Sequence, residues 1–438
     1  MSKFKIKVIK ILMTVLLSGI LFSNNIKFIY AEEIEPLSTE RLYINFVFNS
    51  YIDIEFKAKS ENVTSIKSEI TSIVQLLNAL TDNFNTTISP YEEYANVFDI
   101  NNSFSDVLID DILFDIFTLA SEINIYTNEY YNIGIGKIID NYKNLIANRF
   151  QYEINDSEYQ NAKQKSLEVD ITETKYVLFE EDNKKYISLK SDTLLDLGSI
   201  AKGYAVDEIK KILSKYEVTD YFIDGGSSSM AIGNYTRTEN GYASLGLSSP
   251  YLFNKNYKNY PQIAEYANIT IRNKSIATSN YGQQYGYYKN NIVSHIISPK
   301  TKEPVNNMQS VTLIGDDACL LDAFSTAIYT MTLEEALVFS KKILQDYNIE
   351  TLILDNNLRV HHEFSSDSNY NLVVNVTEIS ENQFSNWFKN NFFYIIIVVI
   401  IIVMICLYLK DFFKSRKSKS IVSNNDDDNE SETPGEDI

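Results

Sequence analysis

Four segments of the sequence combine glycines with side chains that could act on a phosphate, and the first surrounds Lys202. Gly198 and Gly203 bracket the predicted start of a helix, and Lys202 lies in its first turn. Free backbone amides, the positive end of a helix and a lysine together suit a phosphate group. An ordinary strand-to-helix turn capped by Ser199 explains the same pattern, so this segment alone leaves both interpretations open.

The second and third segments are a glycine pair and a histidine. Gly225 and Gly226 permit a tight turn or a close approach of the backbone to a ligand. His295 precedes an apolar pair and a proline, and an imidazole is the natural base near neutral pH. His295 is therefore a candidate general base, with a polar cap at a strand end as the alternative. The other two histidines, His361 and His362, lie in a polar stretch.

The fourth segment pairs a carboxylate with a hydroxyl. Asp322 and Thr326 are four residues apart, so they lie on one face of a helix. Carboxylate and hydroxyl oxygens are hard ligands that suit Mg²⁺ and leave room for substrate phosphates and water. The alternative is a helix start, where an aspartate binds backbone amides and the helix dipole. The pattern therefore indicates either a magnesium site or a helix N-terminus.

The elements that carry these segments indicate a mixed α+β domain. Apolar residues at helical spacing and β-branched runs mark the two kinds of element. Helices are predicted over residues 63–80, 104–119, 200–216, 320–331 and 334–347. Strands are predicted over residues 43–57, 221–223, 269–277, 310–314 and 351–355, with a hairpin over 176–189 that turns at Asp182 and Asn183.

Both ends of the chain predict membrane targeting. Four lysines among the first ten residues precede an apolar run, which indicates a secretory signal peptide over residues 1–31, with an uncleaved anchor as the alternative. Residues 392–409 are uncharged and mostly apolar, long enough for a transmembrane helix. Lysines and an arginine follow at once, so the tail over residues 410–438 is expected in the cytoplasm. Residues 40–365 then form an extracytoplasmic domain, joined to the membrane by residues 366–391.

Composition excludes several classes of protein. The formal net charge of −19 argues against a nucleic-acid partner, because binding would need lysine and arginine to displace phosphate counterions. The two cysteines, Cys319 and Cys406, are too few for a disulfide-stapled fold or a cysteine zinc site.

Taken in order, these segments resemble the ApbE family of FAD:protein FMN transferases. The family pattern runs D-L-G-x-I-A-K-G-Y-A-V-D, a Gly-Gly turn, T-S-G-x-Y, H-I-I-D-P-x-T-G-x-P-V and D-A-x-S-T. It is matched in turn by residues 196–207, 225–226, 278–281, 295–305 and 322–326. Upstream, residues 127–136 resemble T-G-G-A-F-D-P-T-V-G, Ser89 to Tyr91 with Asn101 resemble S-x-Y…N, and residues 48–50 stand in place of M-G-T.

The resemblance implies a two-lobed α+β fold that binds FAD between its lobes. It implies transfer of the FMN half of FAD to a Ser or Thr hydroxyl of an extracytoplasmic acceptor protein, with release of AMP. It implies Mg²⁺ on Asp322, Thr326 and the Ala201 carbonyl, His295 as the base, and Lys202 at the phosphates. The further FAD contacts that it implies are Phe48, Tyr91, Tyr130, Tyr131, Asn132, Gly198, Tyr204 and Ile297. The chain lacks an S/T-G-A-T target motif, so self-flavinylation is not indicated.

Four positions depart from the family pattern. Asn280 replaces a glycine, which is mild because asparagine tolerates similar conformations, and Lys302 replaces another. Ser298 and Asn132 each replace an aspartate. The lost acids leave open a degenerate FAD-binding module without transfer activity. A metal-dependent FAD pyrophosphatase, with water as the acceptor, is a further alternative.

Overall fold

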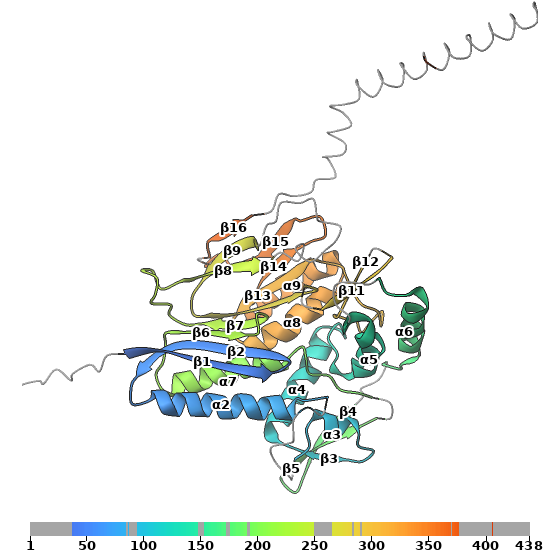
Figure 1. Cartoon of the computed structure of the whole chain (residues 1–438), viewed down its shortest axis with the longest axis horizontal. Coiled ribbons are helices and arrows are strands. Elements are labelled where there is room, and N and C mark those ends of the chain that lie inside the picture. The colour runs from blue at the N-terminus through green and yellow to red at the C-terminus, as the bar shows by residue number, and fades with distance from the viewer. Residues whose placement is uncertain are drawn as a thin grey trace, which may run out of the picture. The chain divides into compact units, whose positions relative to one another are not determined.

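The computed structural model describes residues 37–84, 86, 94–147, 153–171, 176–190, 193–248, 265–282, 284–289, 291–368, 370–375 and 405. Apart from residues 357–359 and 405, these belong to one compact unit of mixed helices and strands (Figure 1). The α+β class is therefore confirmed. The two lobes that the resemblance implied are parts of one packed body.

The centre of the unit is an antiparallel sheet of eight strands. In spatial order the strands are β1 (Leu37–Val47), β2 (Ser50–Lys59), β6 (Tyr221–Gly225), β7 (Ser229–Ile232), β10 (Lys274–Asn280), β13 (Ser310–Gly315), β14 (Glu350–Leu354) and β15 (Val360–Glu363). The single strand predicted over residues 43–57 is wrong, because β1 and β2 form a hairpin. Its two turn residues, Phe48 and Asn49, have φ values of 52° and 54°, as the twist of a tight hairpin favours.

Four helices cover one face of this sheet and enclose the main hydrophobic core. They are α2 (Val63–Leu80), α7 (Ala201–Lys215), α8 (Ala318–Thr330) and α9 (Leu333–Tyr347), all close to their predicted bounds. Helix α8 lies centrally, in contact with α7 and with β7, β10 and β13. Sequence periodicity located α2, α7 and α9 because each has a buried apolar stripe, whereas α8 is buried on nearly every side.

Helix α4 (Asp111–Tyr126) packs against α8 and begins later than predicted. The prediction of a helix over residues 104–119 is wrong at its start, because residues 107–109 form β3 (Val107–Ile109). The Asp110 carboxylate then accepts the Ile112 amide at 2.8 Å and caps the helix. An apolar strand that runs directly into an apolar helix has no clear boundary in periodicity alone.

The other face of the central sheet carries a three-stranded sheet of β8 (Ala243–Ser248), β9 (Glu265–Ile271) and β16 (Leu372–Val374). The strand predicted over residues 269–277 is wrong, since the chain passes from one sheet to the other at Asn273, where φ is 51°. Strand β16 lies inside the range predicted as a linker, so the packed fold extends past residue 365.

The remaining elements flank the α4 side of the unit. They are α3 (Val97–Asn101), the short helix η1 (Ile133–Ile135), α5 (Gly136–Ala147), α6 (Asp156–Glu168), the predicted hairpin β4 (Tyr176–Glu181) and β5 (Lys184–Leu189), and a second hairpin of β11 (Tyr285–Tyr288) and β12 (Asn291–Ser294). Periodicity missed α5 and α6.

The predicted signal peptide, the predicted tail over residues 410–438 and all of segment 392–409 except Ile405 lie outside the described residues. Among the residues that the structure does describe, none of the helices combines the length and apolarity needed to cross a bilayer.

Candidate active site

The site is built where α8 meets the beginning of α7. Asp322 lies in the second turn of α8, is 6% exposed, and accepts a hydrogen bond from the Gly203 amide at 3.1 Å. The cap of α8 is a different residue, Asp317, whose carboxylate accepts the Leu320 amide at 2.9 Å. The alternative that Asp322 serves the start of its own helix is therefore wrong, because it binds the neighbouring helix instead.

The N-terminus of α7 has no side-chain cap of its own. Ile200 occupies the capping position without a side-chain hydrogen bond, and Ser199 instead donates to the Tyr131 hydroxyl at 3.3 Å. The alternative of a turn capped by Ser199 is therefore wrong. At Gly203, an added Cβ would lie 2.4 Å from the Ala318 carbonyl oxygen, so glycine is what lets the two helices approach this closely.

The pKa of the Asp322 carboxyl is raised on balance, because burial outweighs the groups around it that favour the ionised form. Burial raises its pKa, while the Lys202 ammonium, the Gly203 amide and the Ser229 hydroxyl act in the opposite direction. The Ser229 oxygen is buried and makes no regular hydrogen bond of its own. A buried carboxylate beside a hydroxyl without a regular hydrogen bond offers oxygens to a cation, while the lysine suits an anionic ligand.

Hydroxyl groups line the next turn of α8. Thr326 donates to the Asp322 backbone oxygen at 3.2 Å, and its Oγ1 lies 3.4 Å from Ser279 Oγ on β10. Ser279 in turn lies 2.8 Å from Ser325 Oγ. Ser229 and Ser279 were not predicted as site residues. Ser279 stands in the segment 278–281 and Ser229 follows the glycine pair by three residues, but a serine on a strand carries no signal of which face it occupies.

These residues fit Mg²⁺ that is shared with a substrate. Across the described part of the chain, no group of three or more His, Cys, Asp or Glu could hold a metal alone. Asp322, Thr326 and the Ala201 carbonyl offer hard oxygens, and the unsatisfied Ser229 hydroxyl lies beside the carboxylate. Mg²⁺ is commonly held by one or two carboxylates and completes its shell with phosphate oxygens and water.

The three residues of the predicted Tyr130–Asn132 loop have different surroundings. The Tyr130 hydroxyl donates to Glu335 at 2.6 Å, and the Lys300 ammonium lies 4.0 Å from the centre of its ring. Tyr131 is 2% exposed and packs in the main core, so its ring has little surface for a ligand. Asn132 accepts the Gly134 amide at 2.7 Å and caps η1. An aspartate would make this bond too, so the local turn survives the loss of the acid.

His295 follows β12 and is partly exposed. Its Nδ1 lies 2.9 Å from the Gln284 carbonyl oxygen, which can only accept, so we assign the proton to Nδ1. This leaves Nε2 as the basic nitrogen. The preceding hydroxyl, on Ser294, lies near the Tyr329 hydroxyl and partly offsets the large rise that burial causes in the pKa of Tyr329. The end of β12 thus packs on α8 about one turn beyond Thr326.

Two departures from the family pattern lie in the loop after His295. Ser298 is 1% exposed, and its hydroxyl accepts a long hydrogen bond from the Thr301 amide at 3.5 Å, as a carboxylate could. Lys302 has a φ of 58°, the conformation that glycine favours, and its amide donates to the Ser298 carbonyl at 2.8 Å. The Lys302 ammonium also donates to the Val169 carbonyl at 2.7 Å and ties this loop to the end of α6. Both replacements keep the turn.

The other predicted residues are more scattered. Phe48 lies in the β1–β2 turn, where its amide donates to Asn78 at 2.6 Å, and Gly198 donates to Asp196 at 2.8 Å. Tyr204 is half-buried in the first turn of α7, while Ile297 is buried in a separate apolar cluster. Tyr91 lies outside the described residues. The structure therefore brings the Asp322 carboxylate to Lys202 and Gly203 at the start of α7, which begins at Ala201, while Thr326 lies one turn further along α8.

An α+β fold with this helix junction defines a class of protein suited to bind a phosphorylated ligand together with a cation. The sequence model of the ApbE family matches residues 48–353, and the chain belongs to that family.

Two solved structures share the fold. The ApbE protein from Thermotoga maritima matches with a TM-score of 0.58 and 19% identity, over 74% of this chain and 97% of its own. The flavin transferase ApbE from Vibrio cholerae matches with a TM-score of 0.55 and 18% identity, over 76% of this chain and 98% of its own.

Two curated relatives share sequence over shorter stretches. A protein named FAD:protein FMN transferase from Buchnera aphidicola is 26% identical over 237 residues, which cover 53% of this chain and 64% of the relative. One of the same name from Klebsiella pneumoniae is 25% identical over 166 residues, which cover 38% and 48%. The chain thus spans about half to two thirds of the length of these relatives.

Proposed function

We propose that this chain is an FAD:protein FMN transferase. The observation that carries the proposal is the placement of the Asp322 carboxylate beside Lys202 and the N-terminus of α7, whose own capping residue makes no side-chain hydrogen bond. The pyrophosphate of FAD is anionic, and a lysine, a helix N-terminus and a cation are the groups that bind phosphates. The names of the curated relatives support the same activity.

Each residue of the junction has a defined part in binding. Mg²⁺ would be held by Asp322, Thr326 and the Ala201 carbonyl, and when bound it would neutralise charge on the pyrophosphate. The Lys202 ammonium would bind the same phosphates from the first turn of α7. The hydrogen bond between Asp322 and Gly203 keeps the carboxylate aimed at this turn before any ligand arrives.

The reaction moves one phosphoryl-linked group. The Ser or Thr hydroxyl oxygen of an acceptor protein attacks the FMN phosphorus, and a new P–O bond forms. The bond from that phosphorus to the bridging oxygen breaks, and AMP leaves with this oxygen. The hydroxyl proton passes to Nε2 of His295, whose ring the Gln284 carbonyl orients through Nδ1. The product is a phosphoester between FMN and the acceptor.

The location of this activity is also a proposal. The basic, apolar N-terminus and the apolar run over residues 392–409 support an extracytoplasmic catalytic region on a single membrane span. The acceptor would then be an extracytoplasmic flavoprotein. Protease added to intact cells should remove residues 32–391 and leave a fragment that carries the acidic tail. Protection of the catalytic region would contradict this topology.

The activity is tested with the full chain, FAD, Mg²⁺ and an acceptor protein that bears the family's target motif. Covalent flavin is followed by in-gel fluorescence, and AMP release is measured in parallel. Labelled acceptor with AMP supports the transferase. AMP without label indicates the pyrophosphatase, and FAD binding with neither product indicates the degenerate binding module.

A further inference from the structure

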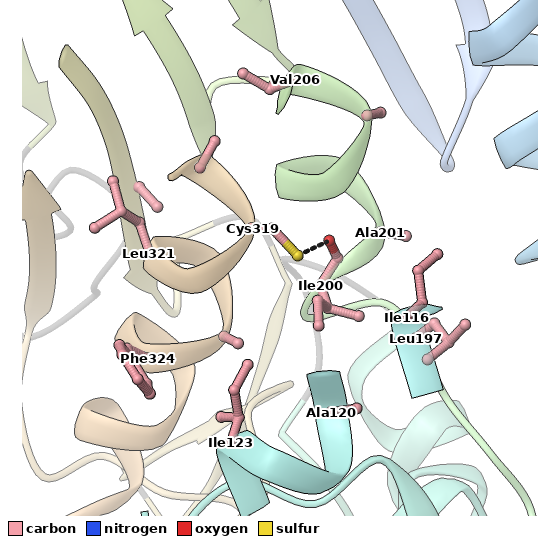
Figure 2. Packing of buried hydrophobic residues seen from close by; sticks show 14 of the residues in the cluster. Ile116, Ala120, Ile123, Leu197, Ile200, Ala201, Val206, Cys319, Leu321 and Phe324 are labelled. Atoms are coloured by element: carbon pink, nitrogen blue, oxygen red, sulfur yellow. Dashed lines mark hydrogen bonds between the residues drawn. The ribbon is translucent and has the colours of Figure 1, made fainter. Parts of the chain in front are cut away.

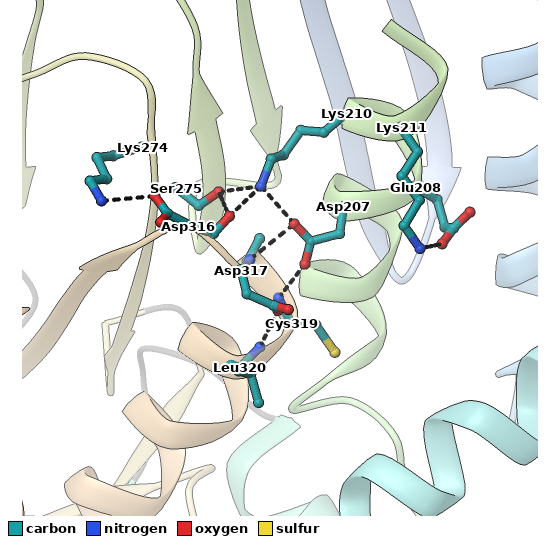
Figure 3. Close-up of polar contacts among 11 residues, drawn as sticks. Asp207, Glu208, Lys210, Lys211, Lys274, Ser275, Asp316, Asp317, Cys319 and Leu320 are labelled. Carbon is teal, nitrogen blue, oxygen red and sulfur yellow. Dashed lines mark hydrogen bonds and ion pairs between the residues drawn. The ribbon is translucent and has the colours of Figure 1, made fainter. Parts of the chain in front are cut away.

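Asp207 makes a second connection between α7 and α8. Its carboxylate accepts the Ala318 amide at 3.1 Å and the Cys319 amide at 2.8 Å, both in the first turn of α8 (Figure 3). The Lys210 ammonium lies 2.9 Å from the same carboxylate. A largely buried carboxylate that binds two backbone amides of another helix is a strong and directional contact.

The two connections are spaced by one turn on each helix. Gly203 and Asp207 are four residues apart on α7, and their partners Asp322 and Ala318 are four residues apart on α8. The two helices therefore run in opposite directions, and the two contacts are separated by one turn on both helices. One contact alone would let α8 pivot about Gly203, whereas two contacts fix both its rotation and its position along α7.

Lys210 extends this connection to the central sheet. Its ammonium donates to Ser275 Oγ on β10 at 3.1 Å and to the Asp316 carbonyl just before α8. Lys274 pairs with the Asp316 carboxylate at 2.8 Å. Asp207 is therefore bound by two amides of α8 and by Lys210 of its own helix, and Lys210 links this contact to β10 and to the residue before α8.

We propose that Asp207 is a positioning residue, which sets α8 against α7 so that Asp322 and Thr326 face Ala201 and Lys202. This role rests on the proposed function, because the site that it positions is the one assigned there. Asp207 contacts neither FAD nor metal in this account and acts through the backbone of α8.

If Asp207 served only to cap α8, its loss would have the same effect as the loss of another cap of that helix. Helix α8 already has its own cap in Asp317, which binds the Leu320 amide. Asp207→Asn can accept one amide through its Oδ1 but directs an NH₂ group at the other, so it breaks the contact between helices. Asp317→Ala removes a carboxylate and a cap from the same helix but leaves that contact intact, which makes it the matched control.

Cys319 supplies a reporter inside the contact. It is 3% exposed, and its sulfur lies 4.0 Å from the Ile200 carbonyl oxygen, between α7 and α8 (Figure 2). A buried thiol reacts with an alkylating reagent only when its surroundings open. The alkylation rate of Cys319 in the folded full chain therefore measures how often the helices separate, and peptide mass spectrometry distinguishes it from Cys406.

The experiment compares the full-length wild type, Asp207→Asn and Asp317→Ala. Three quantities are measured: the alkylation rate of Cys319, the Mg²⁺ concentration for half-maximal FMN transfer, and the thermal shift caused by Mg²⁺ with FAD present. For Asp207→Asn we expect about tenfold faster alkylation and an Mg²⁺ midpoint raised about 10- to 100-fold, as is usual for the loss of groups that orient metal ligands. For Asp317→Ala the alkylation rate should rise no more than about fivefold, as for the loss of a helix cap, and the Mg²⁺ midpoint should stay near that of the wild type.

Equal effects of the two variants would overturn the positioning role, since helix stability alone would explain them. An unchanged Mg²⁺ midpoint in Asp207→Asn, with a wild type that transfers FMN, would overturn it as well and leave the proposed function standing. A wild type that neither transfers FMN nor responds to Mg²⁺ would overturn the proposed function, and this role with it.

Discussion

The carboxylate of Asp322 on α8 accepts a hydrogen bond from the backbone amide of Gly203 on α7 at 3.1 Å. Asp322 thus binds a free backbone amide in the first turn of α7, although it lies 119 residues later in the chain. The second oxygen of this carboxylate takes no part in that hydrogen bond, so the contact that packs two helices also leaves an oxygen ligand for the proposed cation.

Asp322→Asn is expected to separate these two roles. The amide oxygen can still accept from Gly203, so the thermal midpoint should stay near that of the wild type. FMN transfer should fall by about 100-fold or more, because the only carboxylate proposed as a metal ligand is lost. Asp317→Asn, which keeps a good helix cap, is the control that removes a nearby carboxylate. Full Mg²⁺-dependent activity in Asp322→Asn would show that the residue is structural.

His295→Ala is expected to keep FAD binding and to lose FMN transfer by about 10²- to 10⁴-fold, the usual range for a general base. Binding is measured by quenching of flavin fluorescence and transfer by labelling of the acceptor. His362→Ala removes an exposed imidazole outside the site and should transfer normally. Labelling that survives in His295→Ala would remove the role assigned to this residue but not the enzyme.

Ser298→Asp restores the residue of the family pattern and is expected to keep or raise activity. The Asp carboxylate can accept from the Thr301 amide, as the serine hydroxyl does. Ser298→Ala removes that acceptor and should destabilise the chain by about 1 kcal/mol. A large loss of both activity and stability in Ser298→Asp would mean that the loop has adapted to the serine in a way that this hydrogen bond does not explain.

Asp207 should make stability depend on pH. Burial raises its pKa to about 6, with Asp317 adding to the rise and Lys210 opposing it. Because the folded chain then binds this proton more tightly than the unfolded chain, the contribution of Asp207 is full below about pH 4 and is lost as the pH rises through about 6.

The free energy of unfolding of the wild type minus that of Asp207→Asn should therefore decrease between about pH 4 and about pH 7, by roughly 1.4 kcal/mol per unit of pKa shift. The other buried carboxyls with raised pKa, Asp196 and Asp322, are present in both proteins and cancel in the difference. Chemical denaturation across this range measures it. A difference that is constant or grows with pH would contradict the raised pKa.

Local patterns in the sequence were enough for the helices that carry the site. The stripe over residues 200–216 and the spacing of Asp322 and Thr326 predicted α7 and one face of α8. Both are properties of neighbours in the chain, where helical periodicity determines which side chains share a face.

Local patterns did not predict the contacts between residues that are distant in the sequence. The sequence offered Ser199 as the cap of α7, yet the amide of Gly203 is bound by a carboxylate 119 residues away. Asp207 is the last residue of the family motif over residues 196–207, but its two amide partners lie in another helix. The β1–β2 turn was missed because Phe48 is an unusual residue at a positive φ, where turn signals rely on glycine and asparagine.

FMN transfer is measured most directly by intact-protein mass spectrometry of a motif-bearing acceptor after incubation with the full chain, FAD and Mg²⁺, with AMP measured in the same tube. We expect one FMN phosphoester on the acceptor and one AMP released for each, with both products lost together in Asp322→Asn. AMP formed without an adduct, or an adduct that forms equally well in Asp322→Asn, would contradict this expectation.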